Sequence, residues 1–116
     1  DADYTETIFM HPTILFRYSA IGFVGHRIHY DYPYTKNEEN YPDLIVHGPL
    51  QATFLLRAAE KLKGKTVTSF SHKVMAPVFA NSNYIIGAKE NTDGSVSCWG
   101  AVKGSGMTMQ AEAHFE

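Results

Sequence analysis

Two short segments concentrate polar side chains that can do acid–base chemistry. The first reads Gly-His-Arg-Ile-His-Tyr-Asp at residues 25–31, and the second reads Val-His-Gly-Pro-Leu at residues 46–50. In the first segment, His29 and Asp31 are two residues apart, so in an extended chain both side chains point to the same side. The carboxylate would then orient an imidazole, the group that most often moves protons near neutral pH. We therefore expect His29 and Asp31 to serve as a general acid or base.

The second segment lies where a helix is expected to begin. The first backbone N–H groups of a helix have no partner within it, and they lie at the positive end of the helix dipole. A thioester carbonyl that gains enolate charge would be stabilised by such donors, as in an oxyanion hole. We expect the Gly48 N–H to bind that oxygen, and the neighbouring His47 and Pro49 to contact the substrate.

The other polar residues of the first segment have more than one interpretation. His26 is expected to contact the substrate or relay a proton, and Arg27 to meet a carboxylate of the acyl group or a phosphate of its carrier. Arg27 would equally suit a surface salt bridge, and His29 and His47 would suit structural roles. His26 and His29 resemble half of a metal site, but a third and fourth ligand are not apparent. Neither a metal nor a cofactor is expected.

One helix must position the second segment. From Pro49 to Leu62 apolar residues recur at steps of three and four, while polar residues take the other faces. The apolar set is Leu50, Phe54, Leu55, Ala58, Ala59 and Leu62, and the polar set is Gln51, Arg57, Glu60, Lys61 and Lys63. Proline suits the first turn, lysines suit the last turn, and Gly64 ends the helix. The pattern predicts an amphipathic helix that needs a sheet to cover its apolar face.

Strand patterns follow that helix along the chain. Their predicted ranges are 66–75, 84–90, 96–103 and 107–115, and turn residues such as Asn91-Thr92-Asp93-Gly94 separate them. Before the helix we expect a short strand at 5–10, a short helix or irregular turn at 14–23, and a loop or lid with one helical turn at 30–42. Three or four neighbouring strands joined by short turns predict an antiparallel sheet around the helix, an α+β architecture.

Bulk composition limits the possible functions. With 116 residues the chain has room for one domain spanning 1–116. Ten basic and twelve acidic residues are scattered, which argues against nucleic acid as a partner, and the sequence has no apolar run of the ~20 residues that a membrane span needs. Cys98 is the only cysteine and is expected to be a buried, inert thiol. The N-terminus lacks signal-peptide features, so we expect a cytoplasmic protein. It also lacks an initiator methionine, so we expect the chain to be part of a longer protein.

Three motifs together carry a family resemblance. They are Phe-Arg-Tyr-Ser-Ala at 16–20, the histidine-rich segment at 25–31, and Tyr-Pro at 41–42 leading to His-Gly-Pro-Leu at 47–50. From about Pro12 to Glu116 the chain resembles the MaoC-like acyl dehydratases, and more narrowly the mesaconyl-C4-CoA hydratases and mitochondrial 3-hydroxyacyl-thioester dehydratases. The resemblance implies a hotdog fold, in which a curved antiparallel sheet wraps around the helix that starts at Pro49.

The resemblance also implies roles for individual residues. His29 matches the histidine that handles the proton or the water, Asp31 matches the acidic residue that follows it, and Gly48 matches the donor to the thioester carbonyl. The broader R-specific enoyl-CoA hydratases carry Ser-Gly-Asp-x-Asn-Pro-x-His. Here Val24 stands at the position of their Asp, and His26-Arg27 stand at the Asn-Pro pair. The usual Asp-His dyad therefore lacks its Asp.

The implied function is hydration or dehydration of an acyl-CoA or acyl-carrier-protein thioester, a step of fatty acid metabolism. Relatives often carry two hotdog units in one chain, with the catalytic unit C-terminal, and a lone unit generally forms a homodimer. In a eukaryote the mitochondrial matrix would be the alternative compartment. Two other functions stay open. One is thioester hydrolysis, although Glu60 lies late on the helix; the other is a non-catalytic acyl-thioester binding domain, which Val24 favours.

Overall fold

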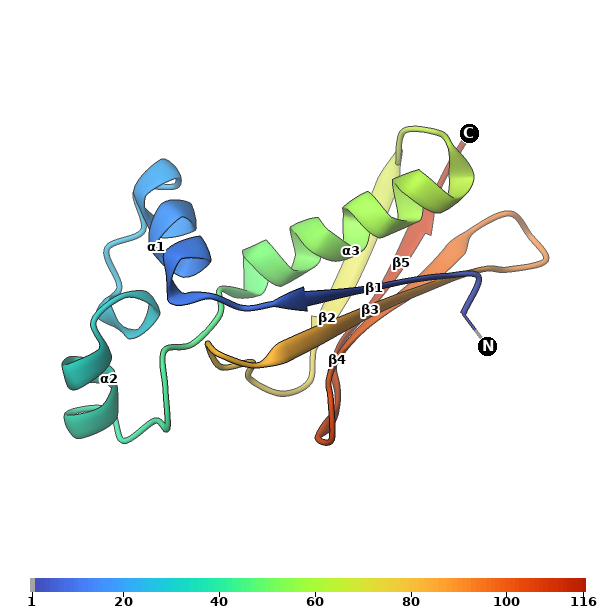
Figure 1. The fold of residues 1–116 in the computed structure, drawn as a ribbon. Coiled ribbons are helices and arrows are strands. Elements are labelled where there is room, and N and C mark those ends of the chain that lie inside the picture. Colours follow the sequence, from blue (N-terminus) through green and yellow to red (C-terminus); the bar gives the residue numbers. More distant parts are fainter. Residues whose placement is uncertain (1) are drawn as a thin grey trace.

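One long helix crosses one face of a five-stranded antiparallel sheet (Figure 1). The structure is a computed structural model and describes residues 2–116. Along the chain the elements are β1 (Tyr4–Phe9), α1 (Pro12–Ile21), the 3₁₀ turn η1 (Arg27–His29), α2 (Tyr32–Asn37), α3 (Gly48–Lys63), β2 (Ser69–Val74), β3 (Asn83–Glu90), β4 (Val96–Val102) and β5 (Gly106–His114). Figure 1 also shows α1 and α2 together at one end of the molecule, beyond the start of α3.

The predicted central helix is confirmed, and it extends one residue further at each end. Its N-terminal turn contains Pro49, and Gly64 ends it in the left-handed region at φ 70°, a conformation that glycine adopts without strain. The helix buries Leu50, Leu55, Ala58 and Ala59 against the sheet, together with Gln51, which the sequence pattern had placed on a polar face. Removing these apolar side chains from water is the main force that holds α3 on the sheet.

The order of strands in the sheet is β1-β3-β4-β5-β2. The β3-β4-β5 meander is the arrangement that the short turns predicted. Strand β2 lies outside this meander and pairs with β5, at the opposite edge of the sheet from β1. The physical reason is that the connection at 75–82 bonds to residues 44–46 instead of forming a tight turn: the Val46 N–H donates to the Val78 carbonyl and the Ala80 N–H to the Leu44 carbonyl, each at 2.8 Å.

The N-terminal part follows the predicted sequence of elements, with shifted boundaries. The first strand, the short helix and the helical turn inside the expected lid are all present, and the lid packs through Thr35, which is fully buried. Cys98 is buried as expected, and burial raises the pKa of its thiol to about 11, which makes it a poor nucleophile. Within residues 2–116, no helix has the length and apolar character to cross a membrane.

Candidate active site

The histidine-rich turn and the start of α3 meet at a cavity of about 510 Å³, which the end of β2 also borders. Its lining includes His29, Gly48 and Gln51 among apolar side chains such as Ile28 and Val74. Another hollow, lined by described residues of β2, β4 and β5, contains Cys98 but none of the residues for which the sequence predicted a catalytic or substrate-binding role. We therefore assign the candidate site to the cavity at the start of α3.

The imidazole of His29 is held in a defined orientation by the backbone. Its Nδ1 lies 2.6 Å from the carbonyl oxygen of Ile45, so in the neutral ring Nδ1–H donates this bond. The second nitrogen, Nε2, is then the one with a free lone pair. Burial lowers the pKa of His29, the bond to Ile45 raises it, and His26 lowers it, with a net shift downward. The ring is therefore neutral near pH 7 and can accept a proton.

The expected pairing of Asp31 with His29 is wrong in this structure. Arg27–His29 form a 3₁₀ turn instead of an extended segment, so Arg27 and Asp31 face each other across a helical turn. One Asp31 oxygen accepts hydrogen bonds from Arg27 at 2.9 and 3.0 Å, and the other accepts the Tyr34 N–H at 3.1 Å. These bonds lower the pKa of Asp31, with Arg27 as the main cause. The carboxylate thus caps α2 and orders the turn.

His47 lies beneath His29 and supports it. The two rings stack with their centroids 3.7 Å apart and an angle of 18° between planes. His47 is 2% exposed, its Nε2 lies 2.7 Å from the Ser19 hydroxyl, and its Nδ1 has no partner among the described residues. Burial lowers the pKa of His47 to about 4, and His29 adds to that shift. His47 is therefore neutral, and its ring is a platform for His29 outside the cavity lining.

Gly48 supplies a backbone donor beside His29. It is the first residue of α3, and the side chain of His47 does not cap the helix. The next residue, Pro49, has no N–H and is exposed, outside the lining of the cavity. The Gly48 N–H is consequently a first-turn donor at the positive end of the helix dipole, next to the cavity. The position of Gly48 is therefore compatible with the oxyanion role, which stays a prediction.

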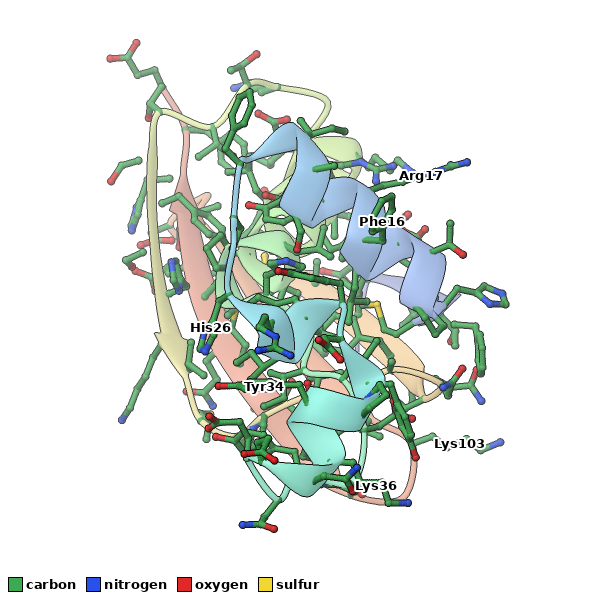
Figure 2. The ribbon with its side chains drawn as sticks, turned by 90° about the vertical axis from the view of Figure 1, so that its left-hand side faces the viewer. Phe16, Arg17, His26, Tyr34, Lys36 and Lys103 are labelled. Carbon is green, nitrogen blue, oxygen red and sulfur yellow. The ribbon has the colours of Figure 1, made fainter. Side chains whose placement is uncertain are left out.

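His26 and Arg27 lie at the rim. The His26 ring is exposed, and its centroid is 5.8 Å from that of His29 in a T-shaped arrangement. The end-on view in Figure 2 shows His26 between α1 and α2, above Tyr34. Arg27 lies over the Tyr34 ring, 4.0 Å from its centroid, while it pairs with Asp31. The salt-bridge interpretation of Arg27 therefore accounts for its position.

Two residues at the site escaped the sequence interpretation. Ser19 is 5% exposed and binds His47, and Gln51 is 2% exposed and borders the cavity. A signal for Gln51 existed, because it precedes the buried Leu55 by four residues and Ala58 by seven, a spacing that places them on one helix face. Among residues 2–116 we find no group of three or more side chains placed to hold a metal ion.

Sequence comparison connects this geometry to known proteins. The family model described as hydroxyacyl-thioester dehydratase type 2 matches residues 1–80. A mesaconyl-C(4)-CoA hydratase of Chloroflexus aurantiacus is 43% identical over 89 residues, which cover 77% of this chain and 32% of that protein. A mitochondrial hydroxyacyl-thioester dehydratase type 2 of Schizosaccharomyces pombe is 37% identical over 73 residues, 60% of this chain and 24% of that protein. The chain thus spans about a third or less of the length of these relatives.

Structural comparison supports the same assignment at the level of the fold. The (R)-hydratase from A. caviae involved in PHA biosynthesis superposes with a TM-score of 0.77 at 17% identity, covering 97% of this chain and 93% of that one. The predicted hotdog fold is confirmed, with a curved antiparallel sheet around α3. Because the family model covers more than half of its residues, the chain belongs to the hydroxyacyl-thioester dehydratase type 2 family.

Proposed function

We propose that this chain adds water to, or removes water from, the acyl group of a thioester, with His29 as general acid or base and Gly48 as oxyanion donor. One observation carries the proposal. A single cavity holds the imidazole of His29, oriented by the Ile45 carbonyl, and the first-turn N–H of α3. A proton acceptor and an anion-stabilising donor side by side are what addition of water next to a thioester carbonyl requires.

In the hydration direction, His29 Nε2 takes a proton from water while the water oxygen forms a bond to C3 of the acyl group. The C2–C3 π electrons move toward the thioester, and the resulting enolate oxygen accepts the Gly48 N–H. The enolate then re-forms the carbonyl as C2 takes a proton. We assign that proton to solvent, relayed through the exposed His26, and the proton held by His29 returns to solvent. Dehydration is the reverse of these steps.

Thioester hydrolysis is a weaker candidate on this scaffold, because it calls for a carboxylate that activates water against the carbonyl. The cavity lining contains no carboxylate among the described residues. Glu60, on the late part of α3, lies twelve residues from Gly48, about 18 Å along the helix axis. Its Oε2 accepts the Val67 N–H at 3.0 Å, which is a structural role.

A binding domain without turnover is the second candidate, and Val24 is the observation that favours it. Val24 takes the position of the catalytic Asp in the broader hydratases, and it lines a shallow hollow with Phe16 and Tyr30 instead of the cavity that holds His29. Under this alternative the chain would retain acyl-thioester binding and lack catalysis. An assay that measures turnover and binding separately distinguishes the two.

For partners, we propose a homodimer, or pairing with a second hotdog unit of a longer chain. Strand β2 is an edge of the sheet, and exposed backbone at an edge favours pairing. Val74 and Met75 are 53% and 49% exposed there and line the cavity, so a second unit along β2 would also close the site. The proposed substrate carrier is CoA or acyl carrier protein. The proposed compartment is the cytoplasm, or the mitochondrial matrix, which the name of the S. pombe relative supports.

The test measures the decrease in the enoyl-thioester absorbance after the protein is mixed with crotonyl-CoA or mesaconyl-CoA. We expect the wild type to consume the band and His29→Gln to lose this activity, while His114→Gln, an exposed histidine on β5, retains it. Gly48→Pro removes the N–H at a position where proline suits a helix. Gly48→Ala is its size control, because the added Cβ would lie 3.9 Å from Val74, an ordinary contact.

Each outcome of this test decides between the candidates. A larger loss with Gly48→Pro than with Gly48→Ala would assign the oxyanion role to the N–H. Release of free CoA thiol would indicate hydrolysis. An unchanged enoyl band with intact ester binding and without thiol release would contradict both enzymatic candidates and leave the binding domain.

A further inference from the structure

The buried amide of Gln51 is a feature of the cavity that the proposed reaction does not use. Gln51 is 2% exposed, lies three residues after Gly48 on α3, and borders the cavity together with His29. An apolar residue at this position would complete the buried face of the helix without a desolvation cost. Burying a primary amide costs free energy unless its polar atoms have partners. The amide therefore calls for an explanation beyond packing.

One end of this amide is held by two hydroxyl groups. The Tyr84 hydroxyl donates to Gln51 Oε1 at 3.3 Å, and the Thr108 hydroxyl, 3.4 Å from the same atom, shares its one hydrogen between that oxygen and the Gly100 carbonyl at 3.3 Å. Nε2, with its two N–H donors, has no protein partner within residues 2–116. Among those residues, His47 Nδ1 is the one solvent-inaccessible polar side-chain atom that lacks a hydrogen-bond partner. Nε2 of Gln51 also lacks a partner, so it must be accessible, and the cavity that Gln51 borders is where it is exposed.

The sheet beneath Gln51 is adapted to place these two hydroxyls. Met109 pairs with Gly100 and Met107 with Ala101, so the β-bulge leaves Thr108 without a partner across the ladder and turns its side chain inward. At Gly100 a Cβ would lie 1.9 Å from the Tyr84 hydroxyl, so this glycine makes room for it. Burial raises the pKa of Tyr84 to about 12, which keeps its hydroxyl protonated as a donor.

We infer that Gln51 is a specificity-determining residue, which donates an N–H to an uncharged carbonyl oxygen carried on the acyl chain beyond the thioester. The inference rests on the proposed function for the position of the thioester at Gly48. Three residues of helix span about 4.5 Å, which matches the distance from the thioester carbon to the fourth or fifth carbon of an acyl chain. Among residues 2–116, no Lys or Arg lines the cavity, and a buried carboxylate without a cation is costly, so a keto group fits better than an acid.

The test compares unreactive saturated esters that differ at one group. Pentanoyl-CoA and 4-oxopentanoyl-CoA have nearly the same shape, and succinyl-CoA carries a carboxylate at the same place. Calorimetry should show that the wild type binds 4-oxopentanoyl-CoA about tenfold more tightly than pentanoyl-CoA, the effect of one well-placed hydrogen bond. In Gln51→Met, which is close in size and has no amide, the two affinities should agree within about twofold.

Two further variants separate positioning from simple stability. Tyr84→Phe and Thr108→Val each remove one donor to Oε1 and leave the amide in place, so each should reduce the preference for the keto ester only in part. Thermal melts of all variants measure how much each substitution destabilises the fold. The change in melting temperature should not correlate with the ratio of the affinities for the keto and alkyl esters. His114→Gln should keep the wild-type ratio. A merely structural Gln51 would change the melting temperature and leave that ratio untouched.

Three outcomes would overturn the inference: equal wild-type affinity for the keto and alkyl esters, a preference that survives in Gln51→Met, or tighter binding of succinyl-CoA than of the keto ester. None of them depends on turnover, because saturated esters cannot be hydrated. A protein that prefers the keto ester and leaves crotonyl-CoA unchanged would contradict the proposed hydratase activity alone. One that hydrates crotonyl-CoA without this preference would contradict the role of Gln51 alone.

Discussion

The rim and the cavity of this site use polar groups in opposite ways. At the rim, Arg27 and Asp31 satisfy each other, and Asp31 also caps α2. In the cavity, His29 and Gln51 each have one polar end held by the protein and the other end free. A held end orients the group, and a free end can bind substrate. The difference teaches that the charged residues of the motif build the turn, while neutral groups are available for chemistry.

The largest expected effect separates two residues of the same turn. His29→Ala should lower kcat/KM for an enoyl thioester by ~10²- to 10⁴-fold, the usual contribution of a general acid or base. Arg27→Gln should change kcat/KM by less than about tenfold, because its guanidinium pairs with Asp31 at the rim. Steady-state kinetics of both variants checks this. Comparable losses in the two would erase the distinction between rim and cavity.

The second prediction concerns the support beneath His29. The pKa of His47 is about 4 in the folded protein and near 6.5 in the unfolded chain, so the unfolded state binds more protons between these values. The contribution of His47 to the free energy of unfolding is therefore fully present above pH 6.5. It is lost as the pH drops toward 4, which lowers the free energy of unfolding by up to about 3 kcal/mol. Denaturant melts of the wild type and His47→Gln over this range measure the effect. If the free energy of unfolding falls with pH as steeply in His47→Gln as in the wild type, His47 is not the source of the pH dependence.

The third prediction addresses the floor of the cavity. Gly100→Ala should destabilise the fold by about 1–3 kcal/mol, because its Cβ would collide with the Tyr84 hydroxyl. Adding Tyr84→Phe removes the nearest colliding atom, while the ring carbon Cζ at 2.4 Å remains, so the double variant should regain part of the lost stability and be more stable than the sum of the single effects predicts. A double-mutant cycle from chemical denaturation measures this coupling. Strict additivity would mean that the two positions do not share the same space.

The smallest expected effect is that of substituting Asp31, at the rim of the site. Asp31→Ala removes the cap of α2 and the ion pair with Arg27, which solvent screens because Arg27 is exposed and Asp31 is partly exposed, so the melting temperature should fall slightly. Turnover should stay within about threefold of the wild type, since the carboxylate does not orient His29. Asp31→Asn keeps a capping oxygen and should lose less stability than Asp31→Ala. A loss of activity as large as that of His29→Ala would restore Asp31 to the catalytic role that its spacing suggested.

The sequence alone determined the elements and the family. The periodicity from Pro49 to Leu62, the terminal Gly64 and the turn residues before each strand are local signals, and local backbone preferences decide where helices and strands begin and end. The ordered motifs at 25–31 and 46–50 likewise identified His29 and Gly48, which the structure brings to one cavity.

Only the tertiary structure decided how these elements use their polar groups. The pairing of β2 with β5, the turn that joins Arg27 to Asp31, and the burial of Gln51 all depend on which surfaces meet. A periodic pattern shows which side of a helix is apolar, but it does not show that a polar residue beside that face will find two hydroxyl partners in the sheet. Those partners, Tyr84 and Thr108, lie 33 and 57 residues away along the chain, and only packing brings them together.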